Sequence, residues 1–167
     1  MAEERTNRLV TRDEKRSYYE IGENYHEMGE GFTTLSESKG AKEYSRKYVN
    51  MKTEVTDVIG YATSLSYSVD VYSQDPVITD ICDIHDSEKL GTDTHRNITT
   101  VNYWQQGATP GTYRASCRTY AVVPDASADG TEALIYSGTF KAVSDIVSGS
   151  WNESTKTFVP DNGKLTD

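Results

Sequence analysis

From Glu54 to Val101 the chain reads EVTDVIGYATSLSYSVDVYSQDPVITDICDIHDSEKLGTDTHRNITTV. Apolar and small polar residues alternate in its first half: Leu65, Tyr67, Val69 and Val71 fall on one face, and Ser64, Ser66, Ser68 and Asp70 on the other. A period of two is the pattern of a half-buried strand. We therefore predict a strand over 61–72 with one apolar face.

A single helix is predicted directly after this strand. Asp75 is a suitable N-cap, and Pro76 falls at the first helical position, where its missing N–H costs nothing. Gly91 follows Leu90 and is suited to a left-handed stop. The helix is therefore expected over about 75–89.

The predicted helix has one broad apolar face. It combines two adjacent stripes, Val77, Ile81 and Ile84 in one and Ile78, Cys82 and His85 in the other. The acidic residues Asp80, Asp83, Asp86 and Glu88 fall mostly away from that face. A helix of this kind must lie against a sheet, so the predicted fold is mainly β, a β-sandwich or partial barrel with one packed α-helix.

Further strands are predicted on both sides of this region. They cover about 42–50, 96–104, 113–123, 132–143 and 145–151, and the last is expected to pair with 156–159. Polar turn residues cluster at 107–111 and at 124–130. Both clusters predict hairpin connections.

Three segments carry too few apolar residues to predict packed structure. Residues 1–17 are charge-dense and predict an N-terminal arm. Residues 22–40 hold four glycines among Glu and Ser, which predicts a long polar loop. Residues 152–167 form a predicted C-terminal extension, and 1–167 as a whole is predicted to be one domain.

Composition limits the classes of partner. The 167 residues carry 26 Asp plus Glu against 17 Lys plus Arg, for a formal net charge of −9. This balance argues against tight binding to nucleic acid phosphates. The sequence has no apolar run near the roughly 20 residues of a membrane helix and no signal-peptide pattern, so we expect synthesis in the cytoplasm and no membrane partner.

The sequence carries no recognisable catalytic motif, which predicts that the protein is not an enzyme. Cys82 and His85, with Asp86 adjacent, could share a metal ion, but no second cluster supplies the remaining ligands. A packed thiol and a helix-surface histidine are the favoured interpretation. Cys82 and Cys117 are expected to be buried and reduced, and no metal or cofactor is predicted.

The ordered pattern of the middle third resembles the tail tube (major tail) proteins of tailed bacteriophages and phage-tail-like particles. It comprises Gly60-Tyr61, Leu65-Ser66-Tyr67, Asp70, Tyr72, Asp75-Pro76-Val77-Ile78 and Gly91-Thr92-Asp93. The resemblance implies a structural virion protein that self-assembles into stacked hexameric rings. In such proteins the inner sheets join into one continuous β-barrel, and DNA passes through the tube during ejection without specific binding.

The resemblance also implies where contacts fall. Arms and loops would reach the adjacent ring, with Arg8, Arg12, Tyr25, Phe32 and Leu35 as candidate inter-ring contacts. Ser64, Ser66, Ser68 and Asp70 are the candidate lumen-facing stripe, although that face could equally meet solvent or a neighbour. Implied partners are the tip or baseplate, terminator, tape measure and sheath proteins, with assembly in the bacterial host cytoplasm. A contractile tail, a non-contractile tail and a DNA-free particle all stay open.

An alternative function rests on the 12 tyrosines. Planar rings stack on sugar faces, so the chain could be a monomeric carbohydrate-binding or adhesion β-sandwich module. Tyrosine is also enriched in strands and at subunit interfaces. The favoured hypothesis assigns the tyrosines to strands and interfaces.

Overall fold

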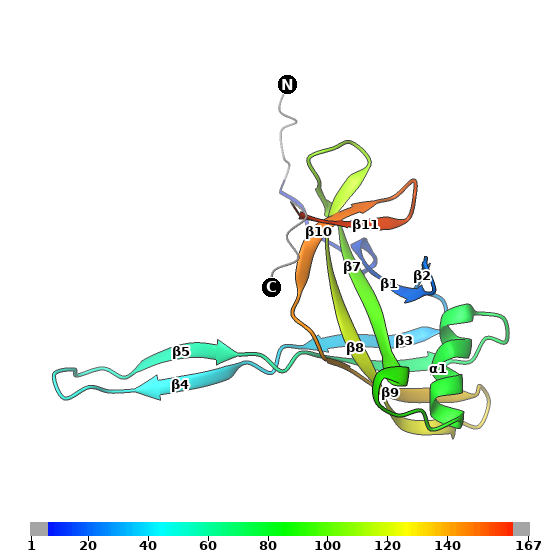
Figure 1. Ribbon diagram of the computed structural model, residues 1–167, viewed down its shortest axis with the longest axis horizontal. Coiled ribbons are helices and arrows are strands. Elements are labelled where there is room, and N and C mark those ends of the chain that lie inside the picture. Colours follow the sequence, from blue (N-terminus) through cyan, green and yellow to red (C-terminus); the bar gives the residue numbers. More distant parts are fainter. Residues whose placement is uncertain (1–6, 162–167) are drawn as a thin grey trace. The chain divides into compact units, whose positions relative to one another are not determined.

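The computed structural model describes residues 7–161 and confirms a mainly β fold of the partial-barrel kind with one packed α-helix (Figure 1). The described residues form two compact units, one of 7–29, 98–117 and 146–161, the other of 30–97 and 118–145. Strands β7 (His95–Gln106) and β8 (Thr112–Asp129) pass from one unit into the other. None of the helices in the described part is long and apolar enough to cross a membrane.

The first unit is a sheet of antiparallel strands, and aromatic side chains form its core. Its further strands are β1 (Lys15–Ile21), β2 (Asn24–Glu27), β10 (Val147–Asn152) and β11 (Thr157–Pro160). They pair in the order β2-β1-β7-β8-β10-β11. Trp151 is fully buried, with Tyr18 stacked on it at 4.3 Å and Tyr25 edge-on at 5.5 Å between ring centroids.

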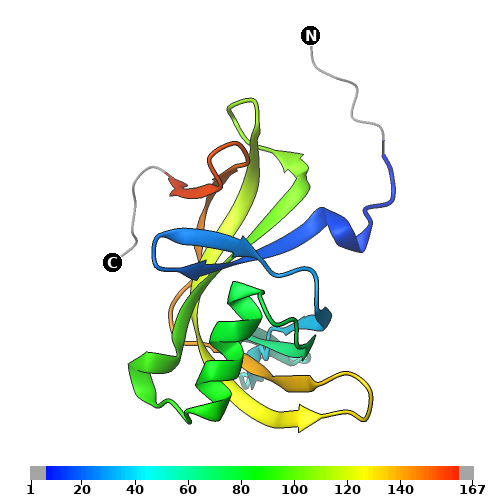
Figure 2. The same ribbon diagram turned by 90° about the vertical axis from the view of Figure 1, so that its right-hand side faces the viewer.

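The second unit carries the helix α1 (Pro76–Asp86) and the strands β3 (Phe32–Ser38), β6 (Ser64–Asp70) and β9 (Ile135–Ala142). With β8 these strands pair in the order β8-β9-β6-β3. The predicted alternation is confirmed, because Leu65, Tyr67 and Val69 are buried. The helix lies along one side of this sheet (Figure 2) and buries Val77, Ile78, Ile81 and Ile84 completely.

Helix α1 begins as predicted but ends earlier. The Asp75 carboxylate accepts hydrogen bonds from the N–H groups of Val77 and Ile78, at 2.9 and 3.2 Å. At the other end Lys89 N–H donates to the Ile84 carbonyl at 3.3 Å and Glu88 N–H to the His85 carbonyl at 3.4 Å. This pair of bonds is a Schellman motif, and its left-handed residue is Glu88, at φ 49°, instead of the predicted Gly91.

The predicted loop over 22–40 is wrong, because it holds β2 and β3. Gly22, Gly31 and Gly40 all have positive φ, between 54° and 92°. Each lies between two successive strands, where glycine adopts the left-handed conformation without strain. Gly22 and Gly31 lie in turns, whereas Gly40 lies just after β3 and close to the Ala62 backbone. The glycines therefore mark separate connections between strands and not one flexible segment.

Other predicted boundaries also shift. Residues 15–17 of the predicted arm are the start of β1, and residues 1–6 lie outside the described part. The C-terminal extension contains β11, paired with β10 as predicted, while 162–167 are likewise outside. The turn predicted at 124–130 lies later, because β8 continues to Asp129 through two irregularities in its pairing with β9. The turn at 107–111 is confirmed.

Candidate assembly surface

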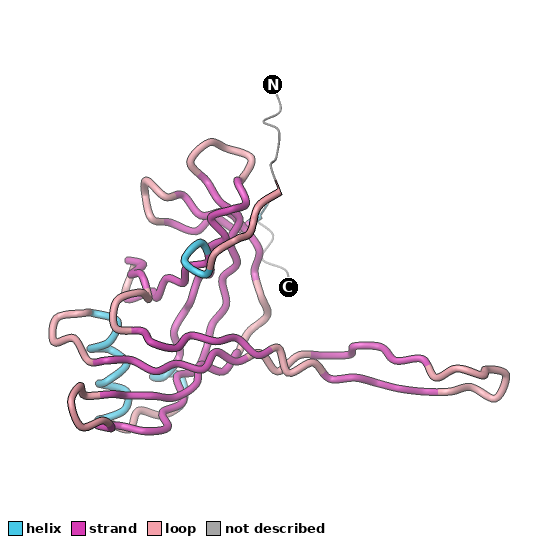
Figure 3. Tube along the Cα trace, turned by 180° about the vertical axis from the view of Figure 1, so that it is seen from behind, coloured by secondary structure: helices cyan, strands magenta, loops and turns pink. Residues whose placement is uncertain are grey.

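The second unit also carries a long hairpin formed by β4 (Lys42–Arg46) and β5 (Val55–Gly60). These two strands pair only with each other and form a separate sheet (Figure 3). From 42 to 60, a range described throughout, every residue is exposed or half-buried. Figure 1 shows the hairpin extending away from β3 and β6 of its own unit. An isolated two-stranded hairpin is marginally stable in water, so this one lacks the packing that stabilises the rest of the unit.

The hairpin exposes large apolar side chains. Along the hairpin and its root these are Tyr44, Tyr48, Val49, Val58, Ile59 and Tyr61, each more than half exposed. Monomeric proteins seldom gather so many on one element, and both hairpin edges keep unpaired backbone groups among the residues described. The element therefore leaves both apolar side chains and strand edges open to solvent in the isolated chain.

Charge and aromatic groups combine on one face of the hairpin. Arg46 forms an ion pair with Asp57 at 2.5 Å, and its Nε donates to the Tyr48 hydroxyl at 3.1 Å. Its guanidinium also lies over the Tyr44 and Tyr48 rings, at 5.3 and 5.9 Å from their centroids. Hydrogen bonds that Arg46 donates to Asp57 and then to Tyr48 raise the pKa of Arg46. Arg46 therefore contacts both tyrosine rings and the Asp57 carboxylate on this face.

The predicted lumen stripe lies on the β6 face opposite the buried core. Ser66 is exposed, and Ser64, Ser68 and Asp70 are half-buried. Register extends this face across the neighbouring strands with Ser38, Ser36, Thr34, Lys141, Thr139 and Ser137. The face is therefore a broad surface of hydroxyl groups with few charges, which the stripe alone did not reveal.

The predicted inter-ring residues do not form one group. Arg8 and Arg12 lie near the start of the described chain, where Arg8 pairs with Glu14 at 2.7 Å and Arg12 donates to the Lys15 carbonyl at 2.6 Å. Tyr25 belongs to the aromatic core of the first unit. Phe32 and Leu35 are half-buried on β3, in register with the core residues Val69 and Tyr67. Their part in assembly stays a prediction.

The prediction that His85 lies on the helix surface is wrong, because its side chain is buried. Its Nε2 is 2.7 Å from the Tyr67 hydroxyl and its Nδ1 is 2.7 Å from Ser127 Oγ, so both ring nitrogens are engaged. Burial lowers the pKa of His85 and keeps it neutral, although the nearby Asp86 carboxylate opposes this shift. Among residues 7–161 no three His, Cys, Asp or Glu side chains gather closely enough to hold a metal ion.

Both cysteines are half-buried, and neither is in a disulfide within the described range. Burial raises the pKa of Cys82 to about 11, and Asp86 adds to the shift. A thiol with a pKa this high is a poor nucleophile at neutral pH. Cys82 therefore acts as a packed apolar side chain beside the helix core.

Sequence reasoning missed the hairpin as a unit, because it predicted a strand at 42–50 and none at 55–60. Val55, Val58 and Ile59 do not alternate cleanly, and the pairing has an irregularity between Lys42 and Glu43. The signal that could have found it is the mostly polar stretch 50–53 between two short runs of strand-forming residues.

No family model matches the chain, and no curated protein sequence matches it. Among solved structures, the chain is similar to one in the cryo-EM structure of the anti-feeding prophage (AFP) baseplate, 6-fold symmetrised. The TM-score is 0.47 at 12% sequence identity, over 86% of this chain and 96% of that chain.

Proposed function

We propose that this protein is a structural, non-enzymatic subunit of a phage tail or phage-tail-like particle that assembles with copies of itself. The observation that carries the proposal is the β4–β5 hairpin, which together with its root at Tyr61 exposes six large apolar side chains and buries none of its own residues. A hairpin of this kind is stabilised when a neighbouring subunit covers it.

The finer proposal follows the resemblance of the middle third to tail tube proteins. In it the subunits form hexameric rings that stack into a tube, and tip or baseplate, terminator, tape measure and sheath proteins bind its ends and surface. Heterologous contacts that close on rotation make such rings, and each open sheet edge then meets a neighbour. The protein would be part of the virion and assemble in the bacterial host cytoplasm.

The hydroxyl-lined face of β3, β6 and β9 is the proposed lumen. Small neutral groups leave a passing duplex without strong attachment, and the net charge of −9 repels phosphates over the roughly 10 Å screening length at moderate salt. Replacing both Ser66 and Ser68 with Arg should therefore slow DNA passage in particles that still assemble. Unchanged genome delivery by such particles would remove this face from the lumen.

Electron microscopy of the purified protein at high concentration, with sedimentation of the same sample, tests assembly. Rings or hollow tubes are expected for the wild type, and an Ile59→Asp variant should stay monomeric because it places a charge on the exposed hairpin. A wild type that stays monomeric even with a tail tip or baseplate present to nucleate it would contradict the proposal.

A second candidate, a monomeric carbohydrate-binding module, is favoured by one observation. Tyr44 and Tyr48 are both exposed on one face of the hairpin, with Arg46 and Asp57 beside them to bond hydroxyl groups. Retardation on a polysaccharide matrix that is lost in a Tyr44→Ala, Tyr48→Ala variant, together with a monomeric wild type, would support this function instead.

A further inference from the structure

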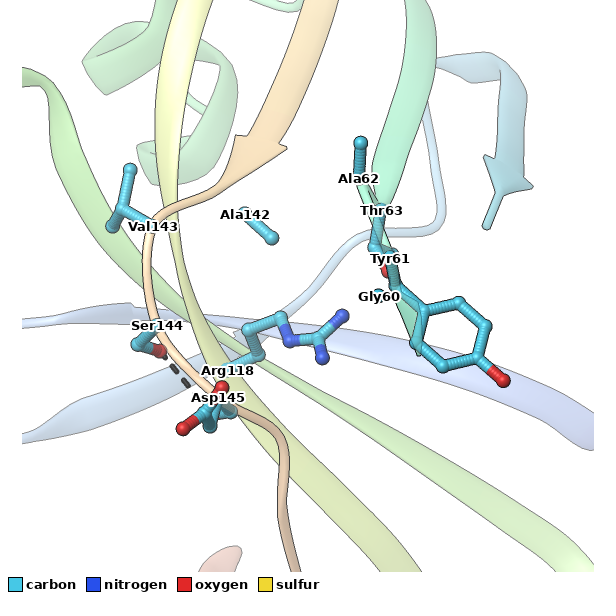
Figure 4. Close-up of a pocket in the computed structure, with 9 residues that line it drawn as sticks. All are labelled: Gly60, Tyr61, Ala62, Thr63, Arg118, Ala142, Val143, Ser144 and Asp145. Atoms are coloured by element: carbon cyan, nitrogen blue, oxygen red, sulfur yellow. Dashed lines mark hydrogen bonds between the residues drawn. The ribbon is translucent and has the colours of Figure 1, made fainter. Parts of the chain in front are cut away.

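A pocket of about 510 Å³ lies in the second unit at the root of the hairpin (Figure 4). Its walls are residues 60–63, which begin at the last residue of β5, and residues 142–145, which begin at the last residue of β9, and Arg118 of β8 also lines it. Figure 4 shows the Arg118 guanidinium extending between the two walls toward Gly60 and Tyr61.

Backbone hydrogen bonds hold the pocket walls in place. Ala142 N–H donates to the Thr63 carbonyl and Val143 N–H to the Thr119 carbonyl, both at 3.0 Å. Thr119 N–H donates to Ser144 Oγ, also at 3.0 Å. The pocket is therefore already formed in the isolated subunit, and a ligand would not have to order these segments.

Arg118 brings an unsatisfied donor to this pocket. Its Nε is buried and has no hydrogen-bond partner among the residues the structure describes. Asp145 lines the same pocket, but it forms no ion pair with Arg118 among the residues that the structure describes. A buried donor without a partner costs free energy. The two Nη groups are neither buried nor hydrogen-bonded within the described part of the chain, so an acceptor that enters the pocket would meet them.

The chemistry of the pocket selects a carboxylate. A guanidinium matches the planar geometry of a carboxylate with two parallel hydrogen bonds. Two exposed apolar side chains line the same pocket, Tyr61 at 63% and Val143 at 47% exposed. A charged group beside exposed apolar groups is typical of a protein interface, whereas a free anion would leave the apolar groups uncovered.

We propose that this pocket receives an Asp or Glu side chain from a second copy of the chain and binds it through Arg118. The inference rests on the proposed self-assembly and names one of its contacts. A second copy is the partner because the chain offers 26 carboxylates against 17 basic side chains and because the pocket adjoins the unpartnered hairpin.

Variants of Arg118 in the full chain test the contact. Arg118→Met should raise the concentration needed for assembly at least about tenfold, since loss of one partner of a buried charge pair is costly. Arg118→Lys keeps the charge but lacks the planar guanidinium, so the concentration that it needs for assembly should lie between those of Arg118→Met and the wild type. Arg114→Met, at an exposed position of the same strand, is the matched control. The concentration that it needs for assembly should stay within about twofold of the wild-type value.

Thermal unfolding of the dilute subunit separates this role from a structural one. Arg118→Met removes an unpaired buried donor, so the Tm should be unchanged or higher than that of the wild type. A lower Tm than that of Arg114→Met would assign Arg118 to the fold and overturn the proposal.

Binding of a polyglutamate peptide to the dilute subunit separates the pocket from assembly. Binding that Arg118→Met abolishes supports the pocket, even if the wild type never assembles and the proposed function fails. If the wild type assembles and Arg118→Met assembles equally well, the proposed contact at Arg118 is wrong, whereas the proposed function is unaffected. If the wild type retains duplex DNA, Arg118→Met loses this retention and assembly is unchanged, the guanidinium binds a phosphate group and not a carboxylate of a second copy.

Discussion

The sheet beneath α1 and the β4–β5 hairpin belong to the same unit, yet the exposed fractions of their apolar side chains differ sharply. Ile81 of the helix is fully buried, whereas Ile59 of the hairpin is 67% exposed. Both regions contain strands with apolar residues, so composition does not separate them. The difference is that α1 covers one face of the sheet, while nothing in the described chain covers the hairpin. Packing against α1 stabilises the sheet, whereas the hairpin is the surface that the proposed assembly would cover.

The largest effect that should separate the two regions comes from shortening the same side chain in each. Ile81→Ala removes fully buried methyl groups and should lower the free energy of unfolding by about 2–5 kcal/mol. Ile59→Ala should change it by less than about 0.5 kcal/mol, because the side chain is exposed. Urea unfolding of both variants measures this, and equal losses would show that the hairpin is packed in solution.

A pair of glycines gives the next contrast. In β9, a Cβ on Gly138 would lie 2.5 Å from the Val123 carbonyl and 2.6 Å from the Tyr67 hydroxyl, so Gly138→Ala forces the sheet or Tyr67 to move. The expected loss is about 1–3 kcal/mol. Gly60→Ala in the hairpin meets nothing within 4 Å and should have little effect. A harmless Gly138→Ala would mean that Tyr67 is not fixed over β9.

Assembly should reverse the ranking of the two regions. Tyr48→Ala on the hairpin should weaken assembly by about 2 kcal/mol, as truncation of an interface tyrosine often does, while leaving the unfolding midpoint unchanged. Tyr72→Ala is the control, since Tyr72 is similarly exposed, at 48%, outside the hairpin. Sedimentation of both variants measures this effect. Equal assembly of the two variants would show that the hairpin is not part of the interface.

A smaller effect should appear with pH, only in the region under α1. Burial lowers the pKa of His85 below its unfolded value, so the unfolded state binds the proton more readily. The stabilisation by neutral His85 is present above the unfolded pKa of about 6.5 and is lost as the pH falls through the folded pKa. The wild-type Tm should therefore fall more steeply below about pH 6.5 than that of His85→Asn. Parallel curves for the two proteins would contradict a neutral buried His85.

The smallest effect is expected from the Arg46–Asp57 pair. Both side chains are on the surface hairpin, where solvent screens the pair, so Asp57→Asn should leave the unfolding midpoint unchanged. The variant should still loosen the Tyr44 and Tyr48 rings, because Arg46 contacts both. Fluorescence anisotropy of the tyrosines at low and high salt would test this, and a shifted midpoint would show that the pair stabilises the fold.

In the first unit, Glu153 illustrates a contact that only folding creates. It accepts hydrogen bonds from Tyr103 at 2.6 Å and from Trp151 at 3.0 Å, and it also pairs with Lys156. Burial alone would raise its pKa, but the hydrogen bonds from Lys156, Tyr103 and Trp151 outweigh burial and lower it. Tyr103 lies 50 residues away in the sequence, so no local pattern indicated this cluster.

The candidate site was predictable only in part. The β6 stripe was found because alternation is local, but its extension across β3 and β9 depends on strand register. Arg118 gave no signal, since a lone arginine in a strand is ordinary, and its unpartnered Nε is a consequence of the segments packed around it. The hairpin was missed because its second strand lacks clean alternation.

The sequence by itself determined the mainly β class, the buried face of β6 and the start of α1 at Asp75. Each of these depends on residues within one or two turns or a few strand positions, where local geometry sets the outcome. Tertiary structure alone decided that residues 22–40 hold β2 and β3 and that the hairpin remains uncovered. Those outcomes depend on pairing and packing between residues far apart in the chain, whose free energies exceed local preferences.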